Sequence, residues 1–320
     1  MHRPMQWVRN IFYVTLAIIG VPVNLVSIVI LSKGNCGLSS CTTRYLVAMS
    51  TADLLVIITE IILRRINNFY FPFNFLDLTS VCRPLYALIR AAVDCSVWFT
   101  ITFTFDRFVA ICCQKLKSKY CTRKTASVVL STTGILLCLK NIPIYFRYEP
   151  GWVTDNVEWS CSNKPSYFTD PRWIGWRRFE KVLTPLLPFI LILLLNALTV
   201  RHILVTSRLR QRLRGQSKKD NHSDSEMERR RKSMILLFSI SGNFIFLWLV
   251  YILYIFDVGY FFDDDSFYIF GKVAYMLRNV SCCTNTFIYV ATQSEFREQL
   301  KSAVKYPVTS IIKLINKQSN

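Results

Sequence analysis

Hydrophobic residues run in seven long stretches along the chain, and short polar segments separate them. An α-helix rises about 1.5 Å per residue, so ~20 apolar residues cross the ~30 Å hydrocarbon core of a bilayer. The pattern therefore predicts seven membrane-spanning helices, which cover residues 8–32, 44–66, 82–112, 125–146, 180–206, 231–256 and 268–290. The fifth stretch is the most uniformly apolar, whereas the second, third and seventh contain ionisable residues.

The segment after the seventh stretch is shorter and amphipathic. From Glu295 to Ile315, apolar residues are mixed with Lys301 and Lys305, as in a helix that lies in the membrane interface. The predicted fold class is thus an all-α membrane protein, a seven-transmembrane helix bundle with a short interfacial eighth helix. We expect a seven-transmembrane domain at 1–292, with a third inner loop at about 207–229, and a membrane-lying eighth helix with a short cytoplasmic tail at 293–320.

Composition and charge support a membrane protein. Of the 320 residues, 18% are charged, against about 25% in soluble domains. The net charge of +19 is compatible with a nucleic-acid partner, but its distribution argues against one. With the N-terminus outside, cytoplasmic segments hold 23 Lys and Arg residues and outer segments hold 12, as the positive-inside rule requires. We expect a multi-pass plasma-membrane protein with an extracellular N-terminus, a cytoplasmic C-terminus and contacts to anionic lipids.

The eleven cysteines fit the same orientation. All but two of them face the reducing cytosol or lie within spans, and only Cys82 and Cys161 lie in the oxidising compartment, where disulfides form. We expect one bridge between them, joining the outer end of the third span to the second outer loop. The alternative is two free thiols.

Charged residues within spans are costly and commonly mark function. Asp53 lies in the middle of the second span, and Asp106 and Arg107 lie together near the inner end of the third. The 25 residues from Cys82 to Arg107 correspond to about 37 Å of helix, enough to cross the membrane with some tilt.

These residues belong to a set of motifs in a fixed order along the chain. The motifs are Gly20–Asn24, LVAMSTADLL at 46–55, Asp106-Arg107-Phe108, Pro188, Phe244 with Trp248, Asn285-Thr286 with Tyr289, and Phe296-Arg297. Together they resemble the motifs of rhodopsin-like (class A) G-protein-coupled receptors over the whole chain. Segments 229–237 and 276–289 are most similar to a small orphan branch of that family, whose members are thought to respond to aromatic amino acids such as tryptophan and phenylalanine.

The chain also departs from the family pattern. Val250 replaces the usual proline of the sixth span, and Thr286 replaces that of the seventh. Because proline is a principal cause of helix kinks, a bend in the sixth span has to come from other residues. Ser239, Ser241 and Gly242 are the candidates.

The resemblance implies roles for the residues at the inner end. Asp106 is expected to pair with Arg107 at rest and to release it on activation, when a heterotrimeric G protein inserts a helix of its α subunit; Asn285 and Tyr289 belong to the same switch. A simpler alternative is that Arg107 only anchors the helix end by reaching toward lipid headgroups.

A second implied site lies in the middle of the bundle. Asp53, Ser96 and Asn285 are expected to hold an allosteric sodium ion, and no other cofactor is expected. The alternative is a polar network filled with water.

We expect the ligand site in the outer halves of the spans, because the first nine residues are too few to form a binding domain. Arg90 or Arg278 could bind a carboxylate or an amide oxygen, Glu60 or Glu180 an ammonium group, and aromatic residues the rest. The full set of candidates is Glu60, Arg64, Arg90, Glu180, Trp248, Tyr251, Tyr275, Arg278 and Asn279. An aromatic zwitterion or a short peptide would suit them; alternatively, the Arg and Glu residues satisfy one another.

The leading hypothesis is therefore a receptor that binds a small extracellular ligand and activates heterotrimeric G proteins. The alternative is a transporter or channel for a small charged solute, which the absence of internal repeats disfavours. An enzyme is not expected, because the sequence shows no metal-ligand spacing and no nucleophile–base pair. The sequence does not indicate whether the protein dimerises.

Overall fold

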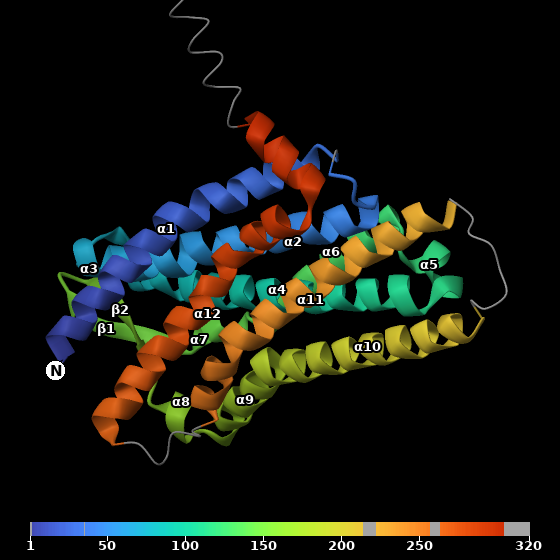
Figure 1. Cartoon of the computed structure of the whole chain (residues 1–320). Coiled ribbons are helices and arrows are strands. Elements are labelled where there is room, and N and C mark those ends of the chain that lie inside the picture. Colours follow the sequence, from blue (N-terminus) through green and yellow to red (C-terminus); the bar gives the residue numbers. More distant parts are fainter. Residues whose placement is uncertain (1, 35, 214–221, 257–262, 304–320) are drawn as a thin grey trace, which may run out of the picture.

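The computed structural model describes residues 2–34, 36–213, 222–256 and 263–303. These residues form a bundle of long helices that run side by side (Figure 1). The long helices are α1 (His2–Ser32), α2 (Ser40–Val56), α4 (Thr79–Cys112), α6 (Arg123–Lys140), α10 (Leu187–Leu213), α11 (His222–Ile255) and α12 (Asp264–Thr292). Shorter helices are η1 (Ile57–Ile66), α3 (Asn67–Tyr70), η2 (Phe75–Asp77), α5 (Gln114–Tyr120), α7 (Pro143–Phe146), α8 (Ser166–Thr169), α9 (Pro171–Lys181) and η3 (Val182–Leu186).

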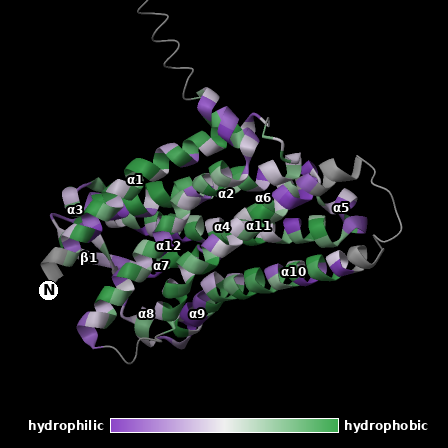
Figure 2. Cartoon of the chain, viewed as in Figure 1, coloured by the Kyte–Doolittle hydropathy of each residue, from purple (hydrophilic) through white to green (hydrophobic). Residues whose placement is uncertain are grey.

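The surface of the bundle is that of a membrane protein. Six helical segments among the described residues are long and apolar enough to cross a bilayer. Large apolar side chains such as Ile18, Ile135 and Phe246 are 61–73% exposed, as expected where lipid replaces water. Figure 2 shows hydrophobic residues along the long helices and hydrophilic residues gathered toward their ends. The seventh span, α12, is less apolar because it carries buried polar residues, including Arg278 and Asn285.

The predicted spans are found, with two differences. The second span continues from α2 through η1, a π-helix of ten residues, into α3. The fifth begins near residue 171 instead of 180, because α9 leads through η3 into α10. Asp170 starts α9 as its N-cap, where its side chain accepts a hydrogen bond of 2.8 Å from the backbone amide of Arg172.

A β-hairpin that the hydropathy pattern did not predict covers one end of the bundle. Its strands β1 (Tyr148–Thr154) and β2 (Val157–Asn163) are antiparallel. Asp155 and Asn156 between them both have positive φ, as the tightest two-residue hairpin turns require. The predicted disulfide is present: Cys82 at the start of α4 is bonded to Cys161 in β2, and a 2.7 Å hydrogen bond from the Thr79 hydroxyl to the Ser160 carbonyl lies beside it.

Helices α1, α2 and α12 pack closely around small and polar residues. A side chain at Gly20 would collide with Cys283 and Ile57 at 2.6 Å, so glycine is needed there. Thr286, which stands in place of the family proline, donates to the Val23 carbonyl at 3.1 Å and lies 2.8 Å from the Ser27 hydroxyl. At this position the structure uses a hydrogen-bonded link between α12 and α1.

After α12 the chain turns into a further helix at residues 294–303. Phe296 from this helix is fully buried and contacts the ring of Tyr289 at 5.8 Å. The predicted third inner loop and tail fall partly outside the described residues, at 214–221 and 304–320. Below, the hairpin end means the end that carries β1, β2, α3 and α8, and the Asp106 end means the opposite one, which carries α5 and residues 294–303 (Figure 1).

Candidate functional site

A cavity of about 310 Å³ lies among the helices at the hairpin end. Seven of the nine predicted ligand residues line it: Glu60, Arg64, Arg90, Glu180, Tyr251, Tyr275 and Arg278. Its other charged and aromatic lining residues are Tyr86, Arg147, Tyr148, Tyr167, Arg177 and Lys181. The lining therefore holds six cationic side chains and two carboxylates, so the cavity attracts negative charge.

Both carboxylates of the lining already have cationic partners. Glu60 pairs with Arg278 and, at 2.7 Å, with Arg65, which lies outside the lining. The Glu60 and Arg278 side chains are 3% and 4% exposed, so this is a buried ion pair. The charges of Glu60 and Arg278 neutralise each other, as in the alternative interpretation of the Arg and Glu residues, in which they pair with one another. Glu60 is accordingly not a free acceptor for a ligand ammonium group.

Glu180 belongs to a second network, which extends from the cavity to α6. It accepts from Lys140 at 3.2 Å and lies 3.6 Å from Arg90. Lys140 also donates to Asp94 at 2.9 Å, and Asn141 donates to the same carboxylate oxygen at 2.7 Å. Asp94 is fully buried. The sequence reasoning missed Asp94, although a carboxylate in the middle of a predicted span was a usable signal.

Aromatic side chains form the floor of the cavity. Tyr251 packs edge-on against both Tyr275, at 5.2 Å, and Trp248, at 5.7 Å. The Arg278 guanidinium lies 5.1 Å from the rings of Tyr251 and Tyr275. Trp248 itself lies deeper: with Asn279 and Ser96 it lines a separate void of about 10 Å³. The two predicted ligand residues Trp248 and Asn279 thus lie beneath the cavity and do not line it.

The outer wall comes from loop and hairpin residues that hydropathy gave no reason to choose. Arg147 directly precedes β1, Tyr148 begins β1, Tyr167 lies in α8 and Arg177 in α9. Burial raises the pKa of the Tyr148 and Tyr167 phenols, so both stay neutral at physiological pH.

The three residues predicted to hold sodium are brought together in the middle of the bundle. Ser96 donates to one oxygen of Asp53 at 2.5 Å, and Asn285 donates to the other at 2.8 Å. Asp53 is 1% exposed. A carboxylate and a hydroxyl are oxygen ligands of the kind that hard cations take, so these residues fit a small cation, with Ser96 also facing the 10 Å³ void.

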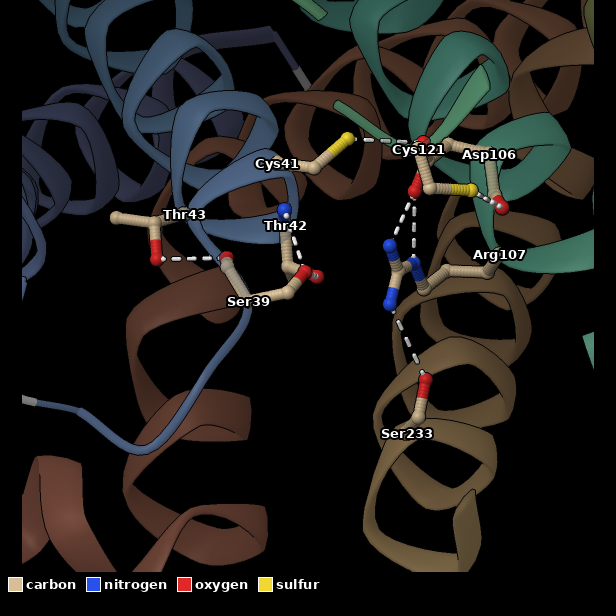
Figure 3. A network of polar contacts seen from close by, with 8 residues as sticks. All are labelled: Ser39, Cys41, Thr42, Thr43, Asp106, Arg107, Cys121 and Ser233. Atoms are coloured by element: carbon tan, nitrogen blue, oxygen red, sulfur yellow. Dashed lines mark hydrogen bonds and ion pairs between the residues drawn. The ribbon is translucent and has the colours of Figure 1, made fainter. Parts of the chain in front are cut away.

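At the Asp106 end, Arg107 is held by α4 and α11. Its guanidinium pairs with the carboxylate of Asp106, and its Nη1 donates to the Ser233 hydroxyl at 3.4 Å (Figure 3). Asp106 also accepts from the Cys41 thiol at 3.0 Å, which ties α2 to the same group. Asp106 is fully buried and Arg107 is 6% exposed. The arginine is therefore paired within the protein and does not extend to the surface.

A second contact closes the same end. Lys232 lies 3.5 Å from Glu295, which begins the helix at 294–303, and 3.3 Å from Glu228 within α11. Hydrogen bonds from its own backbone amide and from Ser294 lower the pKa of Glu295, so it is ionised at neutral pH. Tyr289, predicted to act in the switch, is buried between these elements. The end of α11 is thus linked to both α4 and the last helix.

A helix bundle with a charged cavity at one end and a buried arginine–carboxylate pair at the other is the arrangement of a seven-helix receptor. Comparison with known families agrees: residues 23–289 match the model of the seven-transmembrane receptors of the rhodopsin family. The chain belongs to this family. Family membership supports the receptor hypothesis over an enzyme and over the transporter alternative.

Among curated proteins, a relative is the FMRFamide receptor of Drosophila melanogaster, which is 23% identical over 308 residues. The match covers 91% of this chain and 52% of the relative, so the chain spans about half the length of the relative it matches. This relative is not a member of the aromatic-amino-acid branch suggested by segments 229–237 and 276–289, and it gives that narrower placement no support.

Proposed function

We propose that this protein is a G-protein-coupled receptor that binds a short extracellular peptide in the cavity at the hairpin end. The observation that carries the proposal is the separation of two sites: a 310 Å³ cavity lined by charged and aromatic residues at one end, and the paired Arg107 at the other. A ligand acts on the first site, and a heterotrimeric G protein on the second.

The orientation proposed is hairpin end outside, at the plasma membrane, with the N-terminus extracellular and the C-terminus cytoplasmic. The Cys82–Cys161 disulfide supports it, because such bonds persist in oxidising compartments. The excess of Lys and Arg in the segments of the Asp106 end supports the same orientation. Basic residues there also favour contact with anionic lipids.

Activation would proceed by loss of the contacts that close the Asp106 end. A ligand that favours a bundle with α11 displaced from α4 would break the Arg107–Ser233 hydrogen bond and the Lys232–Glu295 contact. Arg107 would then face a cavity open to the cytosol, into which a G-protein helix inserts. The ligand can shift this equilibrium only by its difference in affinity between the two states.

A peptide ligand is favoured over a single amino acid for two reasons. The polar groups that line the cavity are distributed over several walls, from η1, α4, α8, α9, α11 and α12, so a ligand with several polar groups can contact more of them than a single amino acid can. In addition, the Drosophila relative is named for FMRFamide. An aromatic amino acid is the alternative ligand, because Tyr251 and Tyr275 beside Arg278 would suit its ring and carboxylate.

We further propose that Asp53, Ser96 and Asn285 bind an allosteric sodium ion. The proposal is supported by the burial of the Asp53 carboxylate, which is 1% exposed, and by the Ser96 hydroxyl beside it. Sodium chloride should raise the melting temperature of the purified protein more than choline chloride does, and Asp53→Asn should remove the difference. An equal effect of both salts on the unmodified protein would exclude the ion.

The receptor function is tested by nucleotide exchange. Purified protein in lipid nanodiscs is mixed with heterotrimeric G proteins of several classes, and guanine-nucleotide exchange is measured while short peptides and aromatic amino acids are screened. Ligand-dependent exchange on at least one G protein is the expected result. Ligand binding without exchange on any G protein would contradict the proposal.

A further inference from the structure

One wall of the cavity is a continuous stack of arginine and tyrosine side chains. We call it the arginine–tyrosine ladder; its members, in order of contact, are Arg64, Tyr86, Tyr148, Arg147, Tyr167 and Arg177, and all six line the cavity. They come from η1, α4, β1 and its approach, α8 and α9. Elements far apart in the sequence thus meet along this wall.

The contacts along the ladder are close. Arg64 lies 4.7 Å from the Tyr86 ring, which packs on Tyr148 at 4.8 Å. Arg147 lies between two rings, 5.1 Å from Tyr148 and 3.8 Å from Tyr167. Arg177 continues the stack at 5.3 Å from Tyr167. Stacking fixes the faces of the guanidinium groups and leaves their N–H edges available for hydrogen bonding.

The arginines of the ladder have no carboxylate within ion-pair distance in the described part of the chain. None of Arg64, Arg147 and Arg177 forms an ion pair with a described residue, and the one side-chain hydrogen bond among the three is from Arg147 Nε to Asn163 at 2.7 Å. The deeper arginines differ, because Arg278 and Arg90 both face a glutamate. Three half-buried guanidinium groups beside a cavity, positioned by aromatic rings and lacking carboxylates, are suited to bind carboxylates from outside.

We propose that the arginine–tyrosine ladder is an anion subsite that binds a carboxylate of the ligand, so that the ligand is a short peptide with at least one free carboxylate. The carboxylate comes either from a Glu or Asp side chain or from a free C-terminus. The inference rests on the part of the proposed function that places the ligand in the cavity. It does not depend on G-protein coupling. It sets this chain apart from a receptor for a cationic peptide amide.

The test is affinity selection with the purified full-length protein in nanodiscs. The probes are synthetic tetrapeptide libraries with Glu, Gln or Lys at each position in turn, each made as the C-terminal acid and as the amide. At least tenfold enrichment of Glu over Gln among amides identifies a side-chain carboxylate; the same enrichment of acid over amide in the Gln set identifies the C-terminus. The proposal would be overturned if the Gln amides were retained as well as both the Glu amides and the Gln acids. Enrichment of Lys over Gln, or retention of no peptide, would overturn it as well.

Variants then assign the effect to the ladder. Arg177→Gln and Arg147→Gln should each reduce the preference for the carboxylate at least fivefold. Arg172→Gln is the matched control: it removes the same charge from the same helix α9, but the Arg172 side chain is 92% exposed and pairs with Asp170. An unchanged preference in both ladder variants, or an equal loss in the control, would contradict the assignment.

Two further measurements separate binding from folding. A lower melting temperature without ligand identifies a variant in which loss of the stack has destabilised the fold. Arg177→Lys keeps the positive charge but lacks the planar set of N–H donors of the guanidinium group. In the unmodified protein, the carboxylate preference should fall as the salt concentration is raised; a preference insensitive to salt would argue against the subsite.

The anion subsite and the G-protein coupling can fail separately. If the protein selects carboxylate peptides but no ligand stimulates nucleotide exchange, the proposed coupling is refuted and the subsite is not.

Discussion

The hairpin end and the Asp106 end hold their charges in opposite ways. At the hairpin end, cations outnumber carboxylates around a cavity, and Arg64, Arg147 and Arg177 have no carboxylate partner among the described residues. At the Asp106 end, Arg107 is held by Asp106 and Ser233 and is nearly fully buried. An unneutralised charge beside a cavity suits recognition, whereas a buried and paired charge suits a closed state that an external partner must open.

The largest effect is expected from the buried Glu60–Arg278 ion pair in the lining of the cavity. Glu60→Ala leaves Arg278 and Arg65 without their shared carboxylate, and breaking a buried pair costs about 3–5 kcal/mol. The free energy of unfolding should fall accordingly, whereas replacing both members, as in Glu60→Gln with Arg278→Gln, should recover much of it. Asp170→Asn at the exposed Arg172 pair is the control and should have no measurable effect. Thermal unfolding of ligand-free protein measures all three, and equal losses in Glu60→Ala and the control would contradict the account.

The disulfide makes the hairpin end sensitive to reduction. Cys82→Ser should destabilise the protein by about 2–4 kcal/mol, because the bridge restricts the unfolded chain, and should weaken ligand binding by releasing β2. Cys138→Ala, at a free and exposed cysteine, provides the comparison. A reducing agent should act on the unmodified protein as Cys82→Ser does. If Cys82→Ser binds ligand as well as Cys138→Ala does, the hairpin has no part in the site.

The smallest effects are expected at the Asp106 end, where they alter basal activity. Asp106→Asn weakens the hold on Arg107; a loss of about 1.4 kcal/mol would raise basal nucleotide exchange about tenfold. Ser233→Ala removes a weaker contact of 3.4 Å and should raise it about two- to fivefold. Ile235→Val, at a side chain of the same helix that is 43% exposed, is the control for the second variant. Unchanged or lower basal exchange in Asp106→Asn would show that the pair does not hold the closed state.

Sequence reasoning predicted much of the bundle, because membrane spans have a strong signal in long apolar stretches. The spans, the Cys82–Cys161 bridge and the meeting of Asp53, Ser96 and Asn285 all followed from hydropathy, compartment and family motifs. The sodium-binding role of Asp53, Ser96 and Asn285 stays a prediction. So does the boundary between the predicted domains at 1–292 and 293–320.

The outer wall of the cavity could not be predicted in the same way. Arg147, Tyr148 and Tyr167 lie in a loop region whose path depends on the β-hairpin, and hairpin pairing depends on contacts distant in sequence. The π-helix at Ile57–Ile66 likewise alters which residues of the second span face inward, an effect that a regular 3.6-residue period does not include. Glu60 and Glu180 line the cavity, but their pairing with cations could not be predicted without the positions of other helices.

The central claim is that the hairpin end recognises the ligand and the Asp106 end transmits the response. Its most direct test measures ligand affinity and maximal nucleotide exchange on the same nanodisc preparations of Arg90→Gln and Arg107→Ala. We predict that Arg90→Gln weakens ligand binding about tenfold or more with maximal exchange retained at saturating ligand, and that Arg107→Ala retains affinity but loses exchange. Full exchange by Arg107→Ala, or loss of ligand binding in that variant alone, would contradict the account.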